Sequence, residues 1–214
     1  DLYCAGKQRT WDFLEDVMDE IAELFPSEYI HIGGDEAKFD KWQKCPDCQR
    51  KMKELGYSEE KQLQGYMTRR IEAYVAKKGK RIIGWDEILE CGISKKAGVM
   101  TWVRPHTAVE AARRGNPVVM ALTTNCYLDM MESNLDGEIP GANWMPALSL
   151  QKAYEWDPRP KGLSDEEAKN IMGVEGCLWT DQFMHNASLV EMSPLHENRS
   201  ERYIEYYSLP RVAA

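Results

Sequence analysis

Five short apolar segments alternate with helical stretches along this chain, and this alternation constrains its fold more than any other feature. The segments are rich in β-branched and aromatic residues, which is typical of buried strands. Strands that are joined through helices pair in parallel and need right-handed crossovers. The sequence therefore predicts an α/β fold on a parallel sheet, with strands at residues 29–32, 81–85, 98–102, 117–122 and 173–179.

Two long helices are predicted before the second strand. Apolar side chains at helical spacing begin near Thr10 and stop at Pro26. A second apolar stripe covers residues 63–75, and Gly79 closes it. Both helices are long enough to cover neighbouring strands of the sheet.

Shorter helices are predicted later in the chain from capping-box spacing. Thr107 and Ser164 are each followed three residues later by a glutamate, which is typical of a helix N-terminus. Residues 128–163 are rich in Asn, Gly, Pro and Trp, and we expect a long loop there.

Composition limits the classes of partner. The chain has 214 residues, enough to bury a full core, and we expect one domain over residues 1–214. Its net charge of −8 argues against a nucleic-acid partner, since no Lys/Arg cluster offsets it. No apolar run approaches the roughly 20 residues of a membrane span. We therefore expect no nucleic acid and no membrane span.

Aromatic and acidic side chains follow all five predicted strands. In a parallel barrel the carboxyl ends of the strands converge on one face, where the chemistry of such folds lies. Aromatic walls with carboxylates suit a sugar ring, whose C–H faces stack on the rings while its hydroxyls donate to the acids. The residues concerned are Asp35, Glu36, Trp85, Trp102, Tyr127, Asp129, Trp179 and Asp181.

The adjacent acids Asp35 and Glu36 follow the first strand through two glycines, which permit a sharp turn or the close approach of a ligand. On the dipeptide alone, a helix N-cap and first turn is the more common explanation. The glycines and the later strand ends favour a catalytic pair.

Neighbouring acids are badly placed to flank a sugar ring at the separations of about 5–5.5 Å or 6.5–9.5 Å that ordinary glycosidases use. The pair Asp35–Glu36 suits a mechanism in which the two acids have different roles. One acid protonates the leaving oxygen, while the other positions a nucleophile that belongs to the substrate, such as a 2-acetamido group.

Four segments together resemble the family 20 glycoside hydrolases, the β-N-acetylhexosaminidases. They are HIGGDE at residues 31–36, GWDE at 84–87, CYLD at 126–129 and WTD at 179–181, in the family's order over essentially the whole chain. The resemblance implies hydrolysis of terminal β-linked N-acetylhexosamine from a glycan or glycoconjugate. It implies a retaining, substrate-assisted mechanism through an oxazolinium ion, with no cofactor and no metal.

The resemblance also implies catalytic roles for three residues. Glu36 would be the general acid and then the general base. Asp35 would orient and stabilise the acetamido nitrogen, and Tyr127 would donate to the acetamido carbonyl oxygen.

Other residues would bind the sugar. The resemblance implies that Trp85, Trp102 and Trp179 form the walls of the pocket. Asp129 and Asp181 would accept hydrogen bonds from the C4 and C6 hydroxyls. Asp181 departs from the family pattern, which usually has glutamate there, so its contact would be weaker or would pass through water.

The family fold is a (β/α)8 TIM-type barrel, and this sequence shows five strand–helix units. The resemblance therefore implies strands 4–8 with their helices, in a domain that is incomplete on its N-terminal side. We expect the strand at residues 29–32 to be an unpaired edge. The chain would then self-associate, as a homo-oligomer or through the open barrel edge, or be poorly stable, and it would have little or no activity alone. The resemblance also implies an exported protein, although the chain shows no signal segment.

Two other classes of function stay open. A pocket that binds sugar without chemistry would make a non-catalytic carbohydrate-binding domain. Cys45 and Cys48 could form a local disulfide, half of a metal site or two free thiols in a loop. The metal site is least favoured, because one CxxC without a second pair is a weak signal. We expect His31 to be a packed, hydrogen-bonded core histidine.

Overall fold

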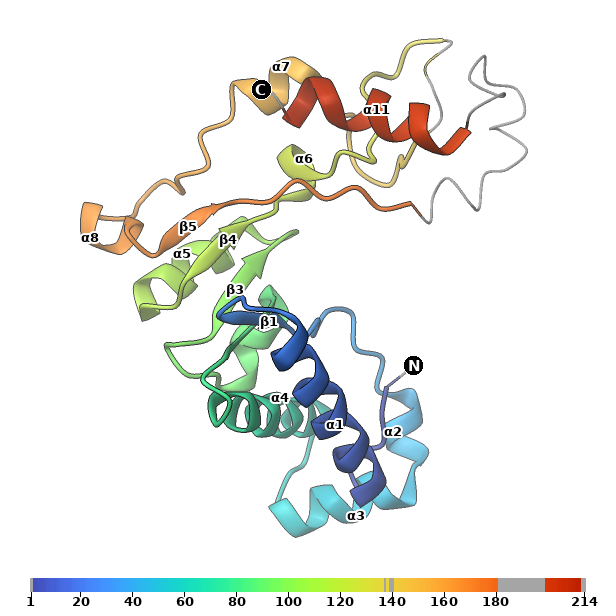
Figure 1. Ribbon diagram of the computed structural model, residues 1–214, viewed down its shortest axis with the longest axis vertical. Helices are drawn as coiled ribbons and strands as arrows, with labels where there is room; N and C mark the ends of the chain where they lie inside the picture. Colours follow the sequence, from blue (N-terminus) through green and yellow to red (C-terminus); the bar gives the residue numbers. More distant parts are fainter. Residues whose placement is uncertain (1, 137, 139–140, 181–198, 213–214) are drawn as a thin grey trace.

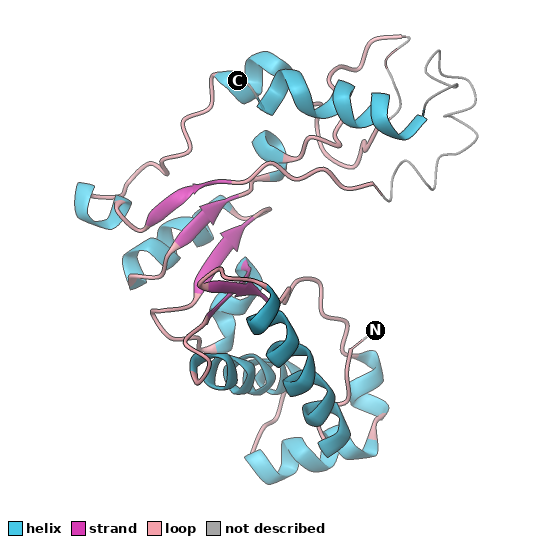
Figure 2. Ribbon diagram, viewed as in Figure 1, coloured by secondary structure: helices cyan, strands magenta, loops and turns pink. Residues whose placement is uncertain are grey.

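The computed structural model describes residues 2–136, 138, 141–180 and 199–212. In this part of the chain, five strands form one parallel sheet in the order β1-β2-β3-β4-β5 (Figure 1, Figure 2). Each strand lies beside its neighbour in sequence, as successive strands do in a (β/α) barrel. The prediction of a parallel α/β fold is therefore confirmed, with β1 Tyr29–His31, β2 Arg81–Trp85, β3 Gly98–Thr101, β4 Val118–Met120 and β5 Ile171–Val174.

The helices begin and end at signals in the sequence. Helix α1, Gln8–Leu24, ends as predicted, with Phe25 as its C-cap immediately before Pro26. The predicted capping box at Ser164 is confirmed, since the Ser164 and Glu167 side chains each accept from the other's backbone N–H. The remaining described helices are α2 Asp40–Lys44, α3 Pro46–Leu55, α4 Glu60–Ala76, η1 Asp86–Cys91, α5 Pro105–Arg114, α6 Thr123–Cys126, α7 Leu150–Tyr154, α8 Asp165–Ala168 and α11 Arg199–Val212.

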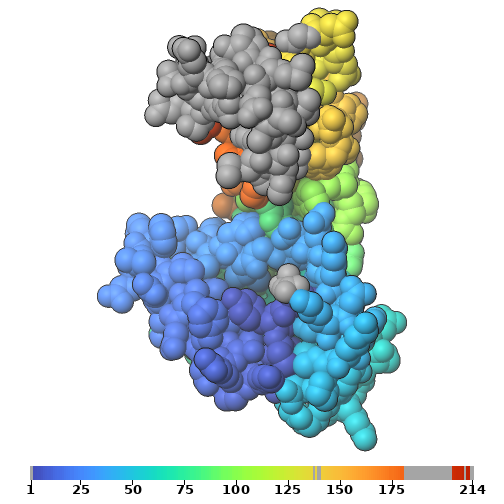
Figure 3. All heavy atoms as spheres, turned by 90° about the vertical axis from the view of Figure 1, so that its right-hand side faces the viewer, coloured from blue at the N-terminus to red at the C-terminus, as the bar shows by residue number. Residues whose placement is uncertain are grey.

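Apolar clusters fix the helices to the sheet. Trp11 of α1 and Ile71 of α4 belong to one buried cluster with Ile82 of β2. Small residues such as Ala108 let α5 pack closely on Val99 of β3 in a second cluster. Each fully buried aliphatic or aromatic side chain of this size contributes about 1.5–3 kcal/mol. The helical cover leaves the carboxyl ends of the strands facing one side of the molecule, the side shown in Figure 3.

The fifth strand differs from the prediction. It covers Ile171–Val174 and not residues 173–179. The reason is its partner: β4 ends at Met120, and the chain then turns into α6, so the next residues have no strand to pair with. Within the described ranges, a single parallel bridge, between Tyr127 and Cys177, continues the ladder.

Two further connections were predicted wrongly. β2 and β3 are joined by the 3-10 helix η1, Asp86–Cys91, and not by an α-helix of the expected strand–helix repeat. The segment with Trp42 and the CPDC sequence is helical instead of a loop, because Pro46 is the first residue of α3. Proline is favoured at this position, where a helix does not use the missing N–H.

Thr107 does not cap α5, which also corrects the prediction. The helix begins at Pro105, and Thr107 lies inside its first turn with 4% of its surface exposed. Its Oγ1 donates to Oδ2 of Asp86 at 2.6 Å. The Asp86 carboxylate is completely buried, and its Oδ1 lies 3.3 Å from Nη2 of Arg104. Thr107 therefore satisfies a buried charge instead of a helix end.

The edge of the sheet agrees with the expectation for β1. Among the described strands, β1 pairs with β2 alone, and its other side carries no strand. Self-association through this edge stays a prediction. No helix in the described ranges is both long enough and apolar enough to cross a bilayer.

Replacing Thr107 with valine tests the role of its hydroxyl. Valine keeps the buried volume but removes the hydrogen bond to Asp86. We expect the free energy of unfolding to fall by about 1–3 kcal/mol, the cost of an unsatisfied buried acceptor. Urea denaturation measures the change, and Thr107→Ser, which keeps the hydroxyl, is the control. Equal losses for valine and serine would contradict the assignment.

Candidate active site

The turn after β1 brings Asp35 and Glu36 to the carboxyl edge of the sheet. Gly33 and Gly34 both have positive φ, 69° and 102°. A Cβ on Gly34 would collide with the Ile88 side chain, so glycine is required for both conformation and space. The Gly34 carbonyl accepts from Nε2 of Gln64 at 2.9 Å, which fixes the turn to α4.

Glu36 itself has an unusual backbone. Its φ of 46° makes it the only described residue other than glycine with positive φ. This left-handed conformation costs an ordinary residue about 1–2 kcal/mol. Such strain persists where the surrounding structure enforces it, and it occurs frequently at active sites.

The residues that the sequence singled out lie around one cavity. Its volume is about 350 Å³. The side chains come from the end of β2 and from the segments that follow β1, β3, β4 and β5. Asp181 lies outside the described residues. The lining residues are Asp35, Glu36, Trp85, Trp102, Tyr127, Asp129, Trp144 and Trp179.

The aromatic rings contact one another around the cavity. The centroid of Trp85 lies 6.1 Å from that of Trp102 and 6.2 Å from that of Trp179. Trp102 stacks on Tyr127 at 6.3 Å with 19° between the planes. Trp144 meets Tyr127 edge-on at 5.9 Å. Ring pairs at such distances hold one another in place, so the cavity has rigid aromatic walls.

Exposure divides the lining residues into a floor and a rim. Trp85, Tyr127 and Asp129 keep only 8%, 3% and 1% of their surface exposed. Trp179 and Trp144 keep 44% and 48%. A ligand would therefore rest on buried rings and a buried carboxylate, between two tryptophans that solvent also reaches.

Trp144 was not singled out in the sequence. It lies in the long stretch between β4 and β5, far from any strand end. The rule that functional groups follow the carboxyl ends of strands, called the strand-end rule below, therefore could not identify it. The Trp content of that stretch was the only available signal.

Tyr127 is a hydrogen-bond donor in this environment. Burial raises the pKa of its hydroxyl well above the ordinary value, and the neighbouring Cys177 and Asp129 raise it further. The group therefore stays protonated at neutral pH, and its O–H can donate to an oxygen of a ligand.

Glu87 was recognised in the sequence as a group after the second strand, but no role in the site was assigned to it. Its Oε2 accepts from the indole N–H of Trp102 at 3.2 Å, which orients a wall of the cavity. Loss of hydration raises the pKa of Glu87, and the neighbouring Asp86 adds to the shift. The GWDE sequence thus supplies a cavity wall, a buried structural acid and a side chain that positions Trp102.

A buried arginine holds the part of the chain that carries Tyr127 and Asp129. Arg211 of α11 is 4% exposed, and its Nη1 donates to the carbonyls of Met130 and Leu148, both at 3.0 Å. The helix α11 and this segment lie side by side in Figure 1. The last described helix therefore fixes the backbone on one side of the cavity.

His31 differs from the prediction of a core histidine. The side chain is exposed at the end of β1, because only β2 covers that strand. Its Nδ1 accepts from Gly33 N–H at 3.1 Å, and its ring meets Trp85 edge-on at 5.3 Å. Partial loss of hydration lowers the pKa of His31, although the negative charges of Glu175 and Asp35 act to raise it. His31 therefore borders the site.

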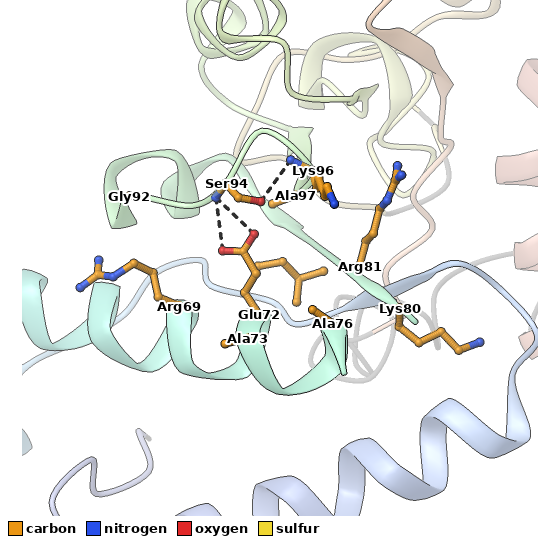
Figure 4. Close-up of a pocket in the computed structure, with 11 residues that line it drawn as sticks. Arg69, Glu72, Ala73, Ala76, Lys80, Arg81, Gly92, Ser94, Lys96 and Ala97 are labelled. Atoms are coloured by element: carbon orange, nitrogen blue, oxygen red, sulfur yellow. Dashed lines mark hydrogen bonds between the residues drawn. The ribbon is translucent and has the colours of Figure 1, made fainter. Parts of the chain in front are cut away.

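A larger groove, of about 430 Å³, lies elsewhere, between α4 and residues 92–97 (Figure 4). It lies near the start of β2, opposite the carboxyl ends. The Glu72 carboxylate already accepts from Ser94 N–H at 3.2 and 3.3 Å. The charged ends of Lys80 and Arg81 diverge in Figure 4 instead of meeting at one point. We therefore place the candidate site at the aromatic cavity.

A parallel α/β sheet with an aromatic, carboxylate-lined cavity at its carboxyl edge is suited to a carbohydrate-active protein. The model of the glycosyl hydrolase family 20 catalytic domain matches residues 1–193. The chain therefore belongs to glycosyl hydrolase family 20, and it is homologous to β-hexosaminidases.

Individual relatives support this assignment. A β-hexosaminidase of Porphyromonas gingivalis is 36% identical over 216 residues, which cover 100% of this chain and 26% of the relative. A β-hexosaminidase of Vibrio furnissii is 35% identical over 174 residues, covering 80% and 28%. The chain thus spans about a quarter of the length of these relatives.

A solved structure supports the same family assignment. The exo-β-N-acetylglucosaminidase of Vibrio harveyi in complex with N-acetylglucosamine has a TM-score of 0.84 at 32% identity. The match covers 99% of this chain and 31% of that one. The five-stranded sheet is therefore consistent with part of a family 20 TIM-barrel catalytic domain.

The raised pKa of Glu87 predicts a pH dependence of stability. An acid whose pKa is higher in the folded state stabilises the fold most below its unfolded pKa, and this contribution is lost as the pH rises through the folded value. We therefore expect the wild type to lose stability relative to Glu87→Gln as the pH rises from about 4 towards neutral. Urea denaturation at a series of pH values measures the difference.

Glu90→Gln is the matched control, on the same short helix. Arg104 lowers the pKa of Glu90, so its contribution has the opposite sign and is lost as the pH falls. Parallel pH profiles for the two variants would contradict the assignment.

Proposed function

We propose that this chain carries the catalytic face of a β-N-acetylhexosaminidase, which removes terminal β-linked N-acetylhexosamine from glycans. The observation that carries the proposal is the single cavity that the Asp35–Glu36 pair shares with four tryptophans, Tyr127 and Asp129. In this proposal the five strands are the fourth to eighth of the barrel, in the order of their motifs.

The first step uses a nucleophile of the substrate. The acetamido carbonyl oxygen attacks the anomeric carbon, and the bond to the leaving oxygen breaks as Glu36 donates its proton to that oxygen. The product is a cyclic oxazolinium ion, which carries the positive charge. Asp35 accepts from the acetamido N–H and stabilises this charge, while the Tyr127 hydroxyl donates to the acetamido oxygen.

The second step returns the enzyme to its starting state. Glu36, now a carboxylate, removes a proton from water as the water oxygen attacks the anomeric carbon. The oxazolinium ring opens and the acetamido group is restored. Two inversions at the same carbon give net retention, in line with substrate-assisted glycosidases.

The geometry of the cavity supports this division of roles. Asp35 and Glu36 are sequence neighbours in a tight turn, so they approach a ligand from one side of the cavity. A cavity of about 350 Å³ is at the small end of ligand sites, which span about 300–1,000 Å³. It therefore suits one terminal sugar in preference to an internal stretch of glycan.

The proposal includes low turnover for the 214-residue chain by itself. Within the described residues, β1 and β5 are opposite edges of the sheet and do not pair with each other. In this proposal the cavity is open between these two edges, so water is not excluded from it. Enzymes strengthen electrostatic interactions by excluding water, and this chain alone would lack that contribution.

Turnover of an aryl N-acetyl-β-glucosaminide tests the activity. We expect kcat/KM for this chain to be roughly a hundredfold or more below that of a full-length relative, the scale of loss from imperfect positioning. Glu36→Gln should remove any residual turnover, and Glu23→Gln, at an exposed position on α1, should leave it unchanged. Turnover equal to that of the relative would contradict the low-activity proposal, and turnover that survives Glu36→Gln would contradict the acid role.

Ligand binding tests the substrate-assisted mechanism without turnover. A thiazoline analogue mimics the oxazolinium ion, whereas N-acetylglucosamine mimics the product. We expect Asp35→Asn and Tyr127→Phe each to weaken binding of the analogue by roughly tenfold to a hundredfold, because a hydrogen bond to a charged group contributes about 1.5–3 kcal/mol. Binding of N-acetylglucosamine should change less. Tryptophan fluorescence measures both affinities.

The same experiment separates the enzyme from a non-catalytic sugar-binding domain. In such a domain, each variant would weaken both ligands equally, and that result would overturn the mechanism while leaving a sugar site. Failure of the wild type to bind either ligand would overturn the sugar site itself.

A further inference from the structure

Three cysteines from two distant parts of the chain meet beside the N-terminus, away from the aromatic cavity. Cys4 precedes α1, whereas Cys45 and Cys48 lie at the start of α3. Sγ of Cys4 lies 3.5 Å from Sγ of Cys45 and 3.6 Å from Sγ of Cys48. All three sulfur atoms lie within 4.8 Å of one another. The N-terminus and α2 are neighbours in Figure 1.

We propose that Cys4, Cys45 and Cys48 form a zinc-binding site. Zinc bound by thiolates is tetrahedral with Zn–S bonds of about 2.3 Å, which places the sulfurs about 3.8 Å apart. The distances from Sγ of Cys4 to the other two sulfurs, 3.5 and 3.6 Å, are close to that edge length. A disulfide needs sulfurs about 2.05 Å apart, so the geometry fits a shared ion better than a covalent pair.

The two backbone segments are built to approach each other at this point. A Cβ on Gly6 would collide with the carbonyl of Asp47, so only glycine permits the approach. The Trp42 indole N–H donates to the carbonyl of Tyr3 at 2.8 Å, and that of Trp11 donates to the carbonyl of Ala5 at 3.2 Å. Both bonds hold the cysteine-bearing segment where it is.

The surroundings suit a thiolate-bound ion. Cys48 is completely buried among apolar residues such as Trp42 and Met52, which limit access of water. Lys7 and Arg50 lie at the border through ion pairs with Asp47, at 3.9 and 2.6 Å. Together with Asp47 they carry a net charge of +1, which offsets the −1 of three thiolates around one divalent ion.

Among the described residues, no fourth side chain joins the cluster. Zinc keeps four ligands, so a water molecule or another exogenous ligand completes the tetrahedron. Soft thiolate ligands select zinc over harder cations such as magnesium and calcium. The site would fasten residues 2–5 to the α2–α3 helices, which directly follow the turn with Asp35 and Glu36.

A dithiol with redox activity is the competing explanation. The backbone N–H of Cys48 lowers the pKa of the Cys45 thiol, which is also typical of CxxC pairs that form disulfides. The experiment therefore has to distinguish a bound metal from an S–S bond.

Titration of the reduced, metal-free chain with Co²⁺ tests the proposal directly. Co²⁺ replaces Zn²⁺ in tetrahedral thiolate sites and produces an intense sulfur-to-cobalt absorption band. We expect a band that saturates at one Co²⁺ per chain and disappears when one equivalent of Zn²⁺ is added. Absence of the band in the wild type would overturn the proposal, and this measurement does not depend on the folding of any variant.

Variants locate the site. Cys4→Ser, Cys45→Ser and Cys48→Ser should each reduce the band strongly, whereas Cys91→Ser, at a buried cysteine outside the cluster, should leave it unchanged. Hydrogen exchange of residues 2–5 should slow when Zn²⁺ is added. A band that persists in all three variants would overturn the assignment. A disulfide among the three cysteines in the zinc-saturated protein, detected by mass spectrometry without reductant, would also overturn it.

Discussion

Because each of the five strands pairs in parallel with the next one along the chain, their carboxyl ends reach the same edge of the sheet. The candidate site depends on this register. A carboxylate pair after β1, an indole at the end of β2, another after β3 and the tyrosine that bridges to Cys177 come together although they are far apart in sequence. An antiparallel arrangement would have sent alternate groups to opposite edges.

Buried polar contacts then hold the site in place. Asp86 is anchored by Thr107 and Arg104, so η1 is fixed beneath the cavity, and the next residue, Glu87, orients Trp102. On the other side, Arg211 binds carbonyl groups of the segment after Tyr127. Each of these groups would be costly to leave unsatisfied, so they tie the loops of the site to the helices.

The strand-end rule predicted most of the residues that line the cavity, because a residue that follows a buried strand has little freedom in where it lies. The same rule could not find Trp144 or Arg211, whose positions depend on how long connections fold back. The local capping and strand patterns misplaced Thr107 and the end of β5. Thr107 has a local capping pattern but a stronger long-range partner in Asp86, and β5 stops where β4 no longer offers an edge.

The sequence by itself determined the alternation of strands and helices, the glycine turn before Asp35 and the family resemblance, since these depend on local spacing and residue type. The tertiary structure decided which distant groups meet. Cys4 lies 41 residues before Cys45, and nothing in the CPDC sequence indicates a third thiol. The left-handed backbone of Glu36 likewise follows from packing around the turn. Such contacts depend on how separate elements dock, which short-range patterns in a chain do not encode.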